Sequence, residues 1–438
     1  MIIGRREMMG ATAVGAALAA TGPVLAKSMS PETGFLWGVA TAAHVSEGQN
    51  INSDYWVLEN IPGTYFREPS GDTNDSWHRW REDLALVKAA GLNSYRFSIE
   101  WARIEPEPGQ FSAATLAHYR AICVACREAG IEPVVTFHHF TSPRWIAAMG
   151  GWENPETADR FARYCEVAAK ALGDSFGWAC TINEPNAQVT SYVIANGKEW
   201  KEQPAIRAAA AKAVGSDRFH AFFMGDSFKV RDICLVAHAK GRDAIKAAAP
   251  HAKVGIALAL QELIAGPGGE AFYRRLYNEA RAPFYEAVRG DDYIGVQTYN
   301  RSRVGPDGYL PPVADDLLDM SKYPAPPEAL AASVREAYRA TGVPVMVSEH
   351  GINTLDDNLR IRHTRASLEH LGKVIDDGLP VLGYFHFTLN DTWEWSAGHV
   401  PRFGMVEVDR ATFERRPRPS LAAYRALIAD TRKRHRWA

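Results

Sequence analysis

The most constraining feature of this 438-residue chain is a series of eight short apolar segments that alternate with stretches of helical periodicity. Each segment is nearly continuous in its apolar residues, which is typical of strands covered on both faces. Eight strand-then-helix units favour an α/β fold with a single (β/α)8 barrel of the TIM type. The alternative, an open doubly wound sheet, lacks a GxGxxG motif after any strand. The predicted strands are 35–40, 94–99, 133–138, 178–183, 253–258, 293–298, 343–348 and 381–386.

Helical patterns and glycines fill the intervals between these strands. Helices are expected at 83–90, 119–129, 156–172 and 230–249. Gly91, Gly130 and Gly342 each stand between a helical pattern and a strand, which is the usual place for a helix C-cap. Two stretches without periodicity, 196–226 and 302–327, follow the fourth and sixth strands. We expect them to be long loops at the catalytic face of the barrel.

The composition excludes several classes of protein. Hydrophobic residues make up 46% and charged residues 23%, as in ordinary globular proteins. The net charge of −2 gives no electrostatic reason to expect a nucleic-acid partner. An odd, sparse set of cysteines indicates neither a disulfide framework nor a paired zinc site, so buried, inert thiols are expected, with a Cys123–Cys126 bridge as the alternative. The five are Cys123, Cys126, Cys165, Cys180 and Cys234.

The N-terminal residues 1–26 have the pattern of an export signal. Arg5 and Arg6 precede a short run rich in Ala and Gly, which ends in a small-residue cleavage pattern at Ala26. Paired arginines of this kind are typical of twin-arginine signals, so we expect export to a bacterial periplasm. The run is too short for a full membrane span, and the alternative is an uncleaved anchor. The barrel domain is then expected to occupy 27–438, without a stable membrane span.

Two glutamates end predicted strands, Glu184 after the fourth and Glu349 after the seventh. Reactive groups of barrel enzymes stand at the C-terminal ends of the strands. Glycoside hydrolysis needs such a pair, with one carboxyl protonated to assist the leaving group and the other ionised. Two nearby carboxyls resist ionising together, which separates their pKa values. Either glutamate alone is more often a salt-bridge partner, so the prediction depends on the pair.

Further polar residues stand at the ends of other predicted strands. Arg96 lies in the second strand and Tyr299 follows the sixth. If both contact Glu349, then Glu349 is the anion and Glu184 the acid. Asn183, beside the acid, is placed to hydrogen-bond a sugar 2-hydroxyl, a contact that strengthens in the transition state.

Short motifs occur along the chain in a characteristic order. They lie at 35–43 with 47–48, 77–83, 95–101, 136–139 with 150–152, 181–185, 349–351, 394–395 and 402–404. In this order and spacing they resemble glycoside hydrolase family 1, the retaining β-glucosidases and their relatives. The resemblance runs from about Phe35 to Ile428.

This resemblance implies hydrolysis by double displacement with net retention, and no metal or organic cofactor. Glu349 would attack the anomeric carbon while Glu184 protonates the leaving oxygen, and Glu184 would then deprotonate water. The two carboxyl groups would lie roughly 5–5.5 Å apart. Arg96 and Tyr299 would tune the nucleophile. By the same motif matching, the substrate-binding residues would be His139, Asn183, Glu394 and Trp395, with Phe387 presenting an apolar face.

Several positions depart from the family pattern. Val45 stands where members usually carry a Gln that grips the glycone, and His44 stands where a Tyr is common. Phe140 and Phe387 each replace a Trp, and His350 replaces the Asn that follows the nucleophile. Loss of polar contacts in a sugar pocket leaves substrate hydroxyls unpaired. We therefore expect a glycone other than plain glucose, such as a deoxy or substituted sugar or one with another hydroxyl pattern.

Alternatives to a retaining β-glycosidase of this family remain open at this point. The same residues suit a transglycosylase, in which an acceptor alcohol replaces water. A non-catalytic sugar-binding relative and an endo-acting barrel glycanase are further readings, and a metal-dependent barrel enzyme is the weakest because no cluster has ligand spacing. In all but the last, the expected partner is a small-molecule or oligosaccharide β-glycoside.

Overall fold

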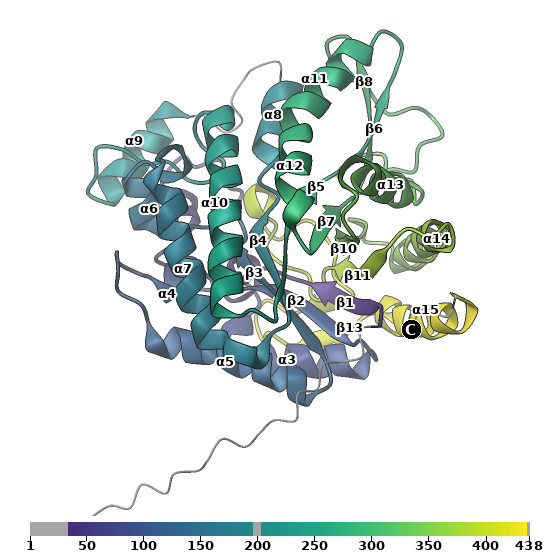
Figure 1. Cartoon of the computed structure of the whole chain (residues 1–438), viewed down its shortest axis with the longest axis horizontal. Coiled ribbons are helices and arrows are strands. Elements are labelled where there is room, and N and C mark those ends of the chain that lie inside the picture. Colours follow the sequence, from purple (N-terminus) through teal and green to yellow (C-terminus); the bar gives the residue numbers. More distant parts are fainter. Residues whose placement is uncertain (1–33, 196–202, 436–438) are drawn as a thin grey trace, which may run out of the picture. The chain divides into compact units, whose positions relative to one another are not determined.

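A closed barrel of eight parallel strands forms the centre of the molecule (Figure 1). The structure is a computed structural model that describes residues 34–195 and 203–435, and the chain from Gly34 onward forms one unit. The barrel strands are β1 (Leu36–Ala40), β2 (Ser94–Ser98), β3 (Glu132–His138), β4 (Trp178–Asn183), β5 (Lys253–Ala259), β7 (Tyr293–Gln297), β10 (Val345–His350) and β11 (Val381–Phe387). This confirms the predicted (β/α)8 barrel, and each strand lies within two residues of its predicted bounds.

Helices follow each barrel strand and cover the outside of the barrel (Figure 1). The outer helices are α3 (Ser76–Ala89), α5 (Ala113–Glu128), α7 (Glu156–Leu172), α10 (Ser227–Ala248), α11 (Glu270–Ala280), α12 (Ala282–Ala287), α13 (Ala329–Thr341), α14 (Asp357–Asp376) and α15 (Pro419–His435). Shorter helices are α1 (Ala43–Ser46), α2 (Asp54–Glu59), α4 (Trp101–Ile104), α6 (Arg144–Ala148) and α8 (Ala187–Ile194). The predicted C-cap glycines Gly91, Gly130 and Gly342 all have positive φ, near 70°. Glycine tolerates this conformation, so each ends its helix without strain.

The two stretches expected to be long loops contain regular structure, which corrects that expectation. The first contains α9 (Pro204–Ala213), an alanine-rich helix whose composition hides the helical period while Pro204 starts its first turn. The second contains β8 (Arg301–Gly305) and β9 (Gly308–Tyr309), which form a sheet with β6 (Glu262–Ala265). A second small sheet pairs β12 (Val406–Val408) with β13 (Arg415–Pro417).

The interior of the barrel contains both an apolar cluster and buried polar side chains. One buried cluster fills the lumen and contains Leu36, Ala40, Val134, Tyr293, Met346, Phe385 and Phe387. Arg96, Asn183 and Gln297 are also almost fully buried, at 0%, 1% and 1% exposure. Buried polar groups require partners, so the apolar cluster forces these side chains to bond one another or a ligand.

The two strands that precede the glutamates are irregular at their C-terminal ends. The pairing of β4 with β5 shifts register between Cys180 and Asn183. The pairing of β10 with β7 shifts between Val347 and Glu349. An extra residue in one strand changes the direction of the side chains that follow it, and such bulges are frequent beside active sites.

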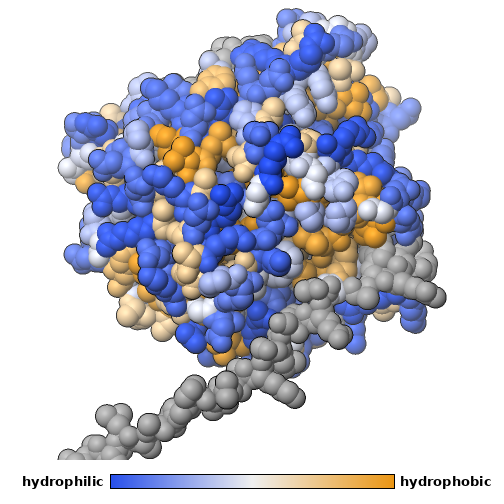
Figure 2. All heavy atoms as spheres, in the orientation of Figure 1, coloured by the Kyte–Doolittle hydropathy of each residue, from blue (hydrophilic) through white to orange (hydrophobic). Residues whose placement is uncertain are grey.

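The cysteines lie in the interior of the described structure, as the sequence predicts. All five cysteines are free and buried, which confirms the expected buried thiols and leaves Cys123 and Cys126 without the alternative bridge. Burial raises the pKa of Cys123 to about 12. Hydrophilic residues predominate on the face shown in Figure 2. Within 34–195 and 203–435, no helix is both long and apolar enough to cross a membrane. The predicted export signal, 1–26, lies outside the described residues.

Candidate active site

Glu349 lies at the end of β10 with both carboxyl oxygens occupied. Arg96 Nη1 donates to Oε1 at 2.5 Å, and the Tyr299 hydroxyl donates to Oε2 at 2.6 Å. The glutamate is 4% exposed. Burial and the Glu349 carboxylate raise the pKa of Tyr299 well above its usual value, so Tyr299 stays protonated and donates. Two donors, one of them cationic, form the charge-assisted arrangement that suits a carboxylate anion.

Asn183, the last residue of β4, bonds the same arginine, and β3 is the one strand between β4 and the β2 strand of Arg96. Its Oδ1 accepts from Arg96 Nη2 at 2.6 Å and from Gln297 Nε2 at 2.8 Å. Its Nδ2 lies 3.1 Å from His139 Nε2. Burial, with smaller contributions from Arg96 and His138, lowers the pKa of His139 well below its usual value. His139 is therefore neutral, and its Nε2 accepts from the asparagine amide.

Glu184 has a different environment, although it directly follows Asn183. It is partly buried, and no other side chain in the described residues hydrogen-bonds its carboxyl group. Burial, and then the charge of Glu349, raise the pKa of Glu184 to about 8, and Arg96 opposes this shift. The carboxyl is thus protonated at neutral pH and free to donate its proton. Its backbone is left-handed, with φ of 47°, which is uncommon for a residue other than glycine.

Glu394 and Trp395 lie on the segment that follows β11. Burial raises the pKa of Glu394 to about 8, with smaller contributions from Glu349 and Asp391, against the opposing hydrogen bond that Thr392 donates at 2.5 Å. The ring of Trp395 is nearly parallel to that of His139, with centroids 6.1 Å apart. This places a flat aromatic surface beside His139 and a protonated carboxyl close enough to Glu349 for the two groups to interact.

Phe387, the last residue of β11, packs against the tyrosine that binds the nucleophile. Its ring meets Tyr299 edge-on, with centroids 5.9 Å apart, and meets Phe403 at 5.6 Å. Phe403 also contacts Tyr299 directly, at 5.5 Å. The apolar face predicted for Phe387 thus supports the position of Tyr299.

Three of the departures from the family pattern occupy buried positions around this site. His44 stacks on Trp395, and its ring nitrogens face Asn50 at 3.0 Å and Glu59 at 3.5 Å, so its polar edge is used inside the protein. Val45 is 1% exposed and belongs to the main hydrophobic core. His350 turns to Tyr384, whose hydroxyl lies 2.9 Å from Nδ1.

The structure brings together all nine residues predicted for the site. Glu184, Glu349, Arg96, Tyr299, His139, Asn183, Glu394, Trp395 and Phe387 are joined by the contacts and charge interactions given above. Sequence reasoning missed Gln297, Thr392 and Phe403. Gln297 offered a signal, because it is a polar residue in an apolar strand and lies two positions before Tyr299, on the same face.

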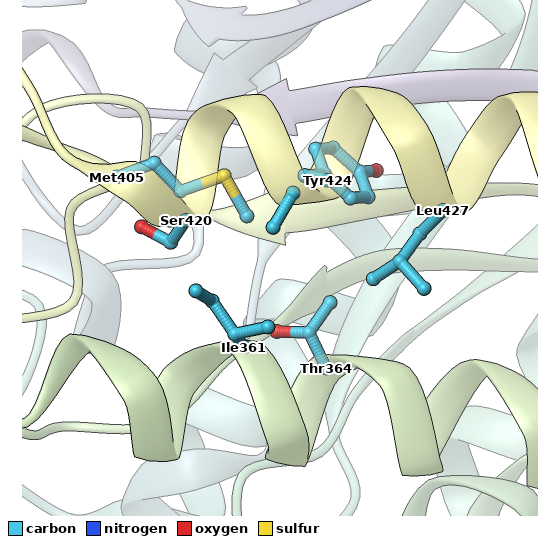
Figure 3. Close-up of a pocket in the computed structure, with 7 residues that line it drawn as sticks. Ile361, Thr364, Met405, Ser420, Tyr424 and Leu427 are labelled. Atoms are coloured by element: carbon cyan, nitrogen blue, oxygen red, sulfur yellow. The ribbon is translucent and has the colours of Figure 1, made fainter.

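A small gap elsewhere in the fold carries no comparable chemistry. It lies between α14 and α15 and is lined by Ile361, Thr364, Met405, Ser420, Ala423, Tyr424 and Leu427 (Figure 3). None of these side chains is among the nine residues predicted for the site. In the described part of the chain, no group of three or more His, Cys, Asp or Glu residues is placed to hold a metal ion.

Comparison with known proteins agrees with this geometry. The family model for glycosyl hydrolase family 1 matches residues 28–270 and 318–433. A bifunctional beta-D-glucosidase/beta-D-fucosidase of Bifidobacterium breve is 28% identical over 470 residues, which cover 91% of this chain and 98% of that protein. Beta-glucosidase A of Thermotoga maritima is 29% identical over 442 residues, covering 87% of this chain and 94% of that protein.

Solved structures show the same relationship in three dimensions. The crystal structure of a beta-glycosidase is 44% identical, with a TM-score of 0.87, and the match covers 91% of this chain and 96% of that one. The apo structure of a beta-glucosidase is 41% identical, with a TM-score of 0.83, covering 90% of this chain and 98% of that one. The chain therefore belongs to glycosyl hydrolase family 1 and is a β-glycosidase.

Proposed function

We propose that this protein is an exported, retaining β-glycosidase in which Glu349 is the nucleophile and Glu184 the acid and base. The observation that carries the assignment is the contrast between the two carboxyls. Both oxygens of Glu349 accept hydrogen bonds from Arg96 and Tyr299, whereas burial and the neighbouring charge raise the pKa of Glu184 to about 8. One group is prepared to attack and the other to donate a proton.

The reaction divides into two displacements. In the first, a Glu349 oxygen bonds to the anomeric carbon, the glycosidic bond breaks, and the leaving oxygen takes the proton of Glu184. In the second, Glu184 accepts a proton from water, the water oxygen bonds to the anomeric carbon, and the bond to Glu349 breaks. Two inversions at one carbon give net retention.

The change of role of Glu184 follows from the causes of its raised pKa. The charge of Glu349 is one of those causes. This charge disappears when Glu349 becomes an ester in the covalent intermediate. The pKa of Glu184 then falls, so the group that donated a proton in the first step accepts one in the second.

His139, Asn183, Glu394 and Trp395 are proposed to hold the glycone. Asn183 keeps an amide N–H for the 2-hydroxyl because its oxygen is already bound twice. The buried Val45 and the internally bonded His44 remove polar contacts from this wall. We infer a glycone with fewer or differently placed hydroxyls than glucose. The Bifidobacterium breve relative, which its name describes as acting on both a β-D-glucoside and a β-D-fucoside, supports a deoxy sugar.

The experiment is an assay of the chain from Lys27 onward against aryl β-glycosides with gluco, galacto, fuco, manno, xylo and glucurono glycones. Nuclear magnetic resonance of the first sugar released reports its anomeric configuration. A β-anomer formed first, with a fucoside or another non-gluco substrate preferred, is the expected result. An α-anomer formed first would overturn the retaining mechanism, and glucosides far better than all others would overturn the glycone proposal.

Export rests on residues 1–26 and is tested separately. The full chain is expressed in a bacterium with a twin-arginine pathway, beside a variant with Arg5→Lys and Arg6→Lys. Activity in the periplasmic fraction for the natural chain alone is expected. Equal distribution of the two proteins would overturn the proposal.

A further inference from the structure

We propose that Gln297 is a positioning residue that fixes the amide of Asn183 and so selects for substrates with a 2-hydroxyl group. This inference rests on the proposed function, because it concerns the same glycone contact. It goes beyond that function by assigning part of the specificity to a residue that touches neither the substrate nor either catalytic carboxyl.

The backbone of Gln297 is held in place by the barrel. It is the last residue of β7, 1% exposed, and pairs in register with Glu349 on β10 and with Ala259 on β5. Strands on both sides therefore hold its backbone. Its Nε2 donates to Asn183 Oδ1 at 2.8 Å, from β7 to β4, and β5 is the one barrel strand between them.

The orientation of the Asn183 amide follows from its donors. Because Arg96 and Gln297 both donate to Oδ1, the NH2 group must face away from them, toward His139. One N–H bonds His139 Nε2, and the second remains for a ligand. A reversed amide would set its NH2 group against two donors and leave all of them unsatisfied.

Arg96 alone would orient the Asn183 amide less firmly, because it divides its donors between Asn183 and Glu349. Its attraction to Glu349 falls when that carboxylate becomes an ester. Gln297 carries no charge, so its bond to Asn183 does not depend on the state of the nucleophile. The second donor therefore keeps the amide in place through both displacements.

The hydrogen bonds of the Gln297 side chain also indicate that it is present for its donor group. Gln297 Oε1 is buried and has no hydrogen-bond partner in the described residues. An unsatisfied buried oxygen is unfavourable, and a residue that only filled space would avoid it. The bond donated to Asn183 is the one polar interaction that the side chain makes in the described structure.

The test compares Gln297→Met with the natural enzyme on a matched pair of aryl β-glycosides, one with the 2-hydroxyl and one 2-deoxy. We expect kcat/KM to fall about tenfold for the first substrate, as for loss of one hydrogen bond, and less than about twofold for the second. Gln188→Met is the matched control. Gln188 is also buried. Its Nε2 donates to Gly225 O at 3.0 Å and its Oε1 is unpaired, but in the described structure it bonds none of the nine site residues. The Gln188→Met variant should leave the ratio of kcat/KM for the two substrates unchanged.

Gln297→Leu is the second variant if the methionine variant does not fold. Its side chain is shorter and also lacks a donor, so the same selective loss is expected. Equal losses on both substrates would show a general structural role and overturn this inference alone. A natural enzyme with no preference for the 2-hydroxyl substrate would overturn the role of Asn183 and, with it, this inference. A natural enzyme that hydrolyses neither substrate would instead contradict the proposed function.

Discussion

Glu184 and Glu349 are the same residue type at the ends of parallel strands in one barrel, yet their surroundings differ. Glu349 is held by a guanidinium and a phenol, one on each oxygen. Glu184 has no side-chain partner in the described residues, and burial beside a negative charge raises its pKa to about 8. The difference teaches that neighbours, rather than the carboxyl itself, assign the two roles. Each prediction below changes one side of this comparison.

Removal of the nucleophile has the largest expected effect. Glu349→Gly should lower kcat by about 10⁴-fold or more, because no other group can form the covalent intermediate. Release of the aryl alcohol measures the loss. Added azide should restore part of the activity by entering the vacated space, with an α-glycosyl azide as product. Activity within tenfold of the natural enzyme would contradict the assignment.

Removal of the acid should have an effect that depends on the substrate. Glu184→Gln should lower kcat/KM by about 10²–10⁴-fold for alkyl or weakly acidic phenol leaving groups. Highly acidic phenols leave without a proton, so the loss in kcat/KM should nearly vanish for them. A series of aryl glycosides of graded leaving-group acidity measures this, and a loss that is constant across the series would exclude Glu184 as the acid.

Removal of one donor from the nucleophile should have an intermediate effect. Tyr299→Phe deletes a hydrogen bond to a charged group, worth about 1.5–3 kcal/mol, or about 10–150-fold in kcat/KM. Tyr293→Phe is the matched control, since its buried hydroxyl donates to Ala179 O at 2.8 Å and not to a carboxyl. Similar losses of kcat/KM in the two variants would contradict a specific role for Tyr299.

The pH profile separates the two carboxyls without changing the leaving group. Because Glu184 must be protonated, kcat/KM should fall above about pH 8, by about tenfold for each further pH unit. The profile of Glu184→Gln should lack this alkaline limb. If kcat/KM of the variant still falls above about pH 8, the fall is due to another group.

Stability should respond to pH more weakly, and Glu394 is the group to change. Burial raises its pKa from 4.5 to about 8, so the native state keeps a proton that the unfolded state loses. The contribution of Glu394 to the free energy of unfolding is constant below pH 4.5 and falls as pH rises toward 8. Above pH 8 it does not change further. Glu394→Gln stays neutral, so its Tm between pH 5 and 9 should fall less steeply, by about 2–4 °C over the range. The exposed Glu369→Gln should follow the natural slope, and equal slopes for all three proteins would contradict the prediction.

The sequence predicted the barrel because its strands are continuous apolar runs, a pattern that depends on burial on both faces. It also placed Glu184, Glu349 and Tyr299 at strand ends and Arg96 within the second strand, where barrel geometry brings side chains together. It did not predict α9, whose alanines carry no apolar period. It missed Gln297, because one polar residue in a strand does not show which side chain it will meet inside the barrel.

The left-handed backbone at Glu184 has a consequence for how this position changes over time. A residue other than glycine there costs about 1–2 kcal/mol of folding free energy. Glycine would remove that cost, but it would also remove the proton donor. Selection for a stable fold and selection for hydrolysis therefore pull residue 184 in opposite directions. In a lineage released from its substrate, replacement of this glutamate by glycine should occur early, because glycine relieves the backbone strain.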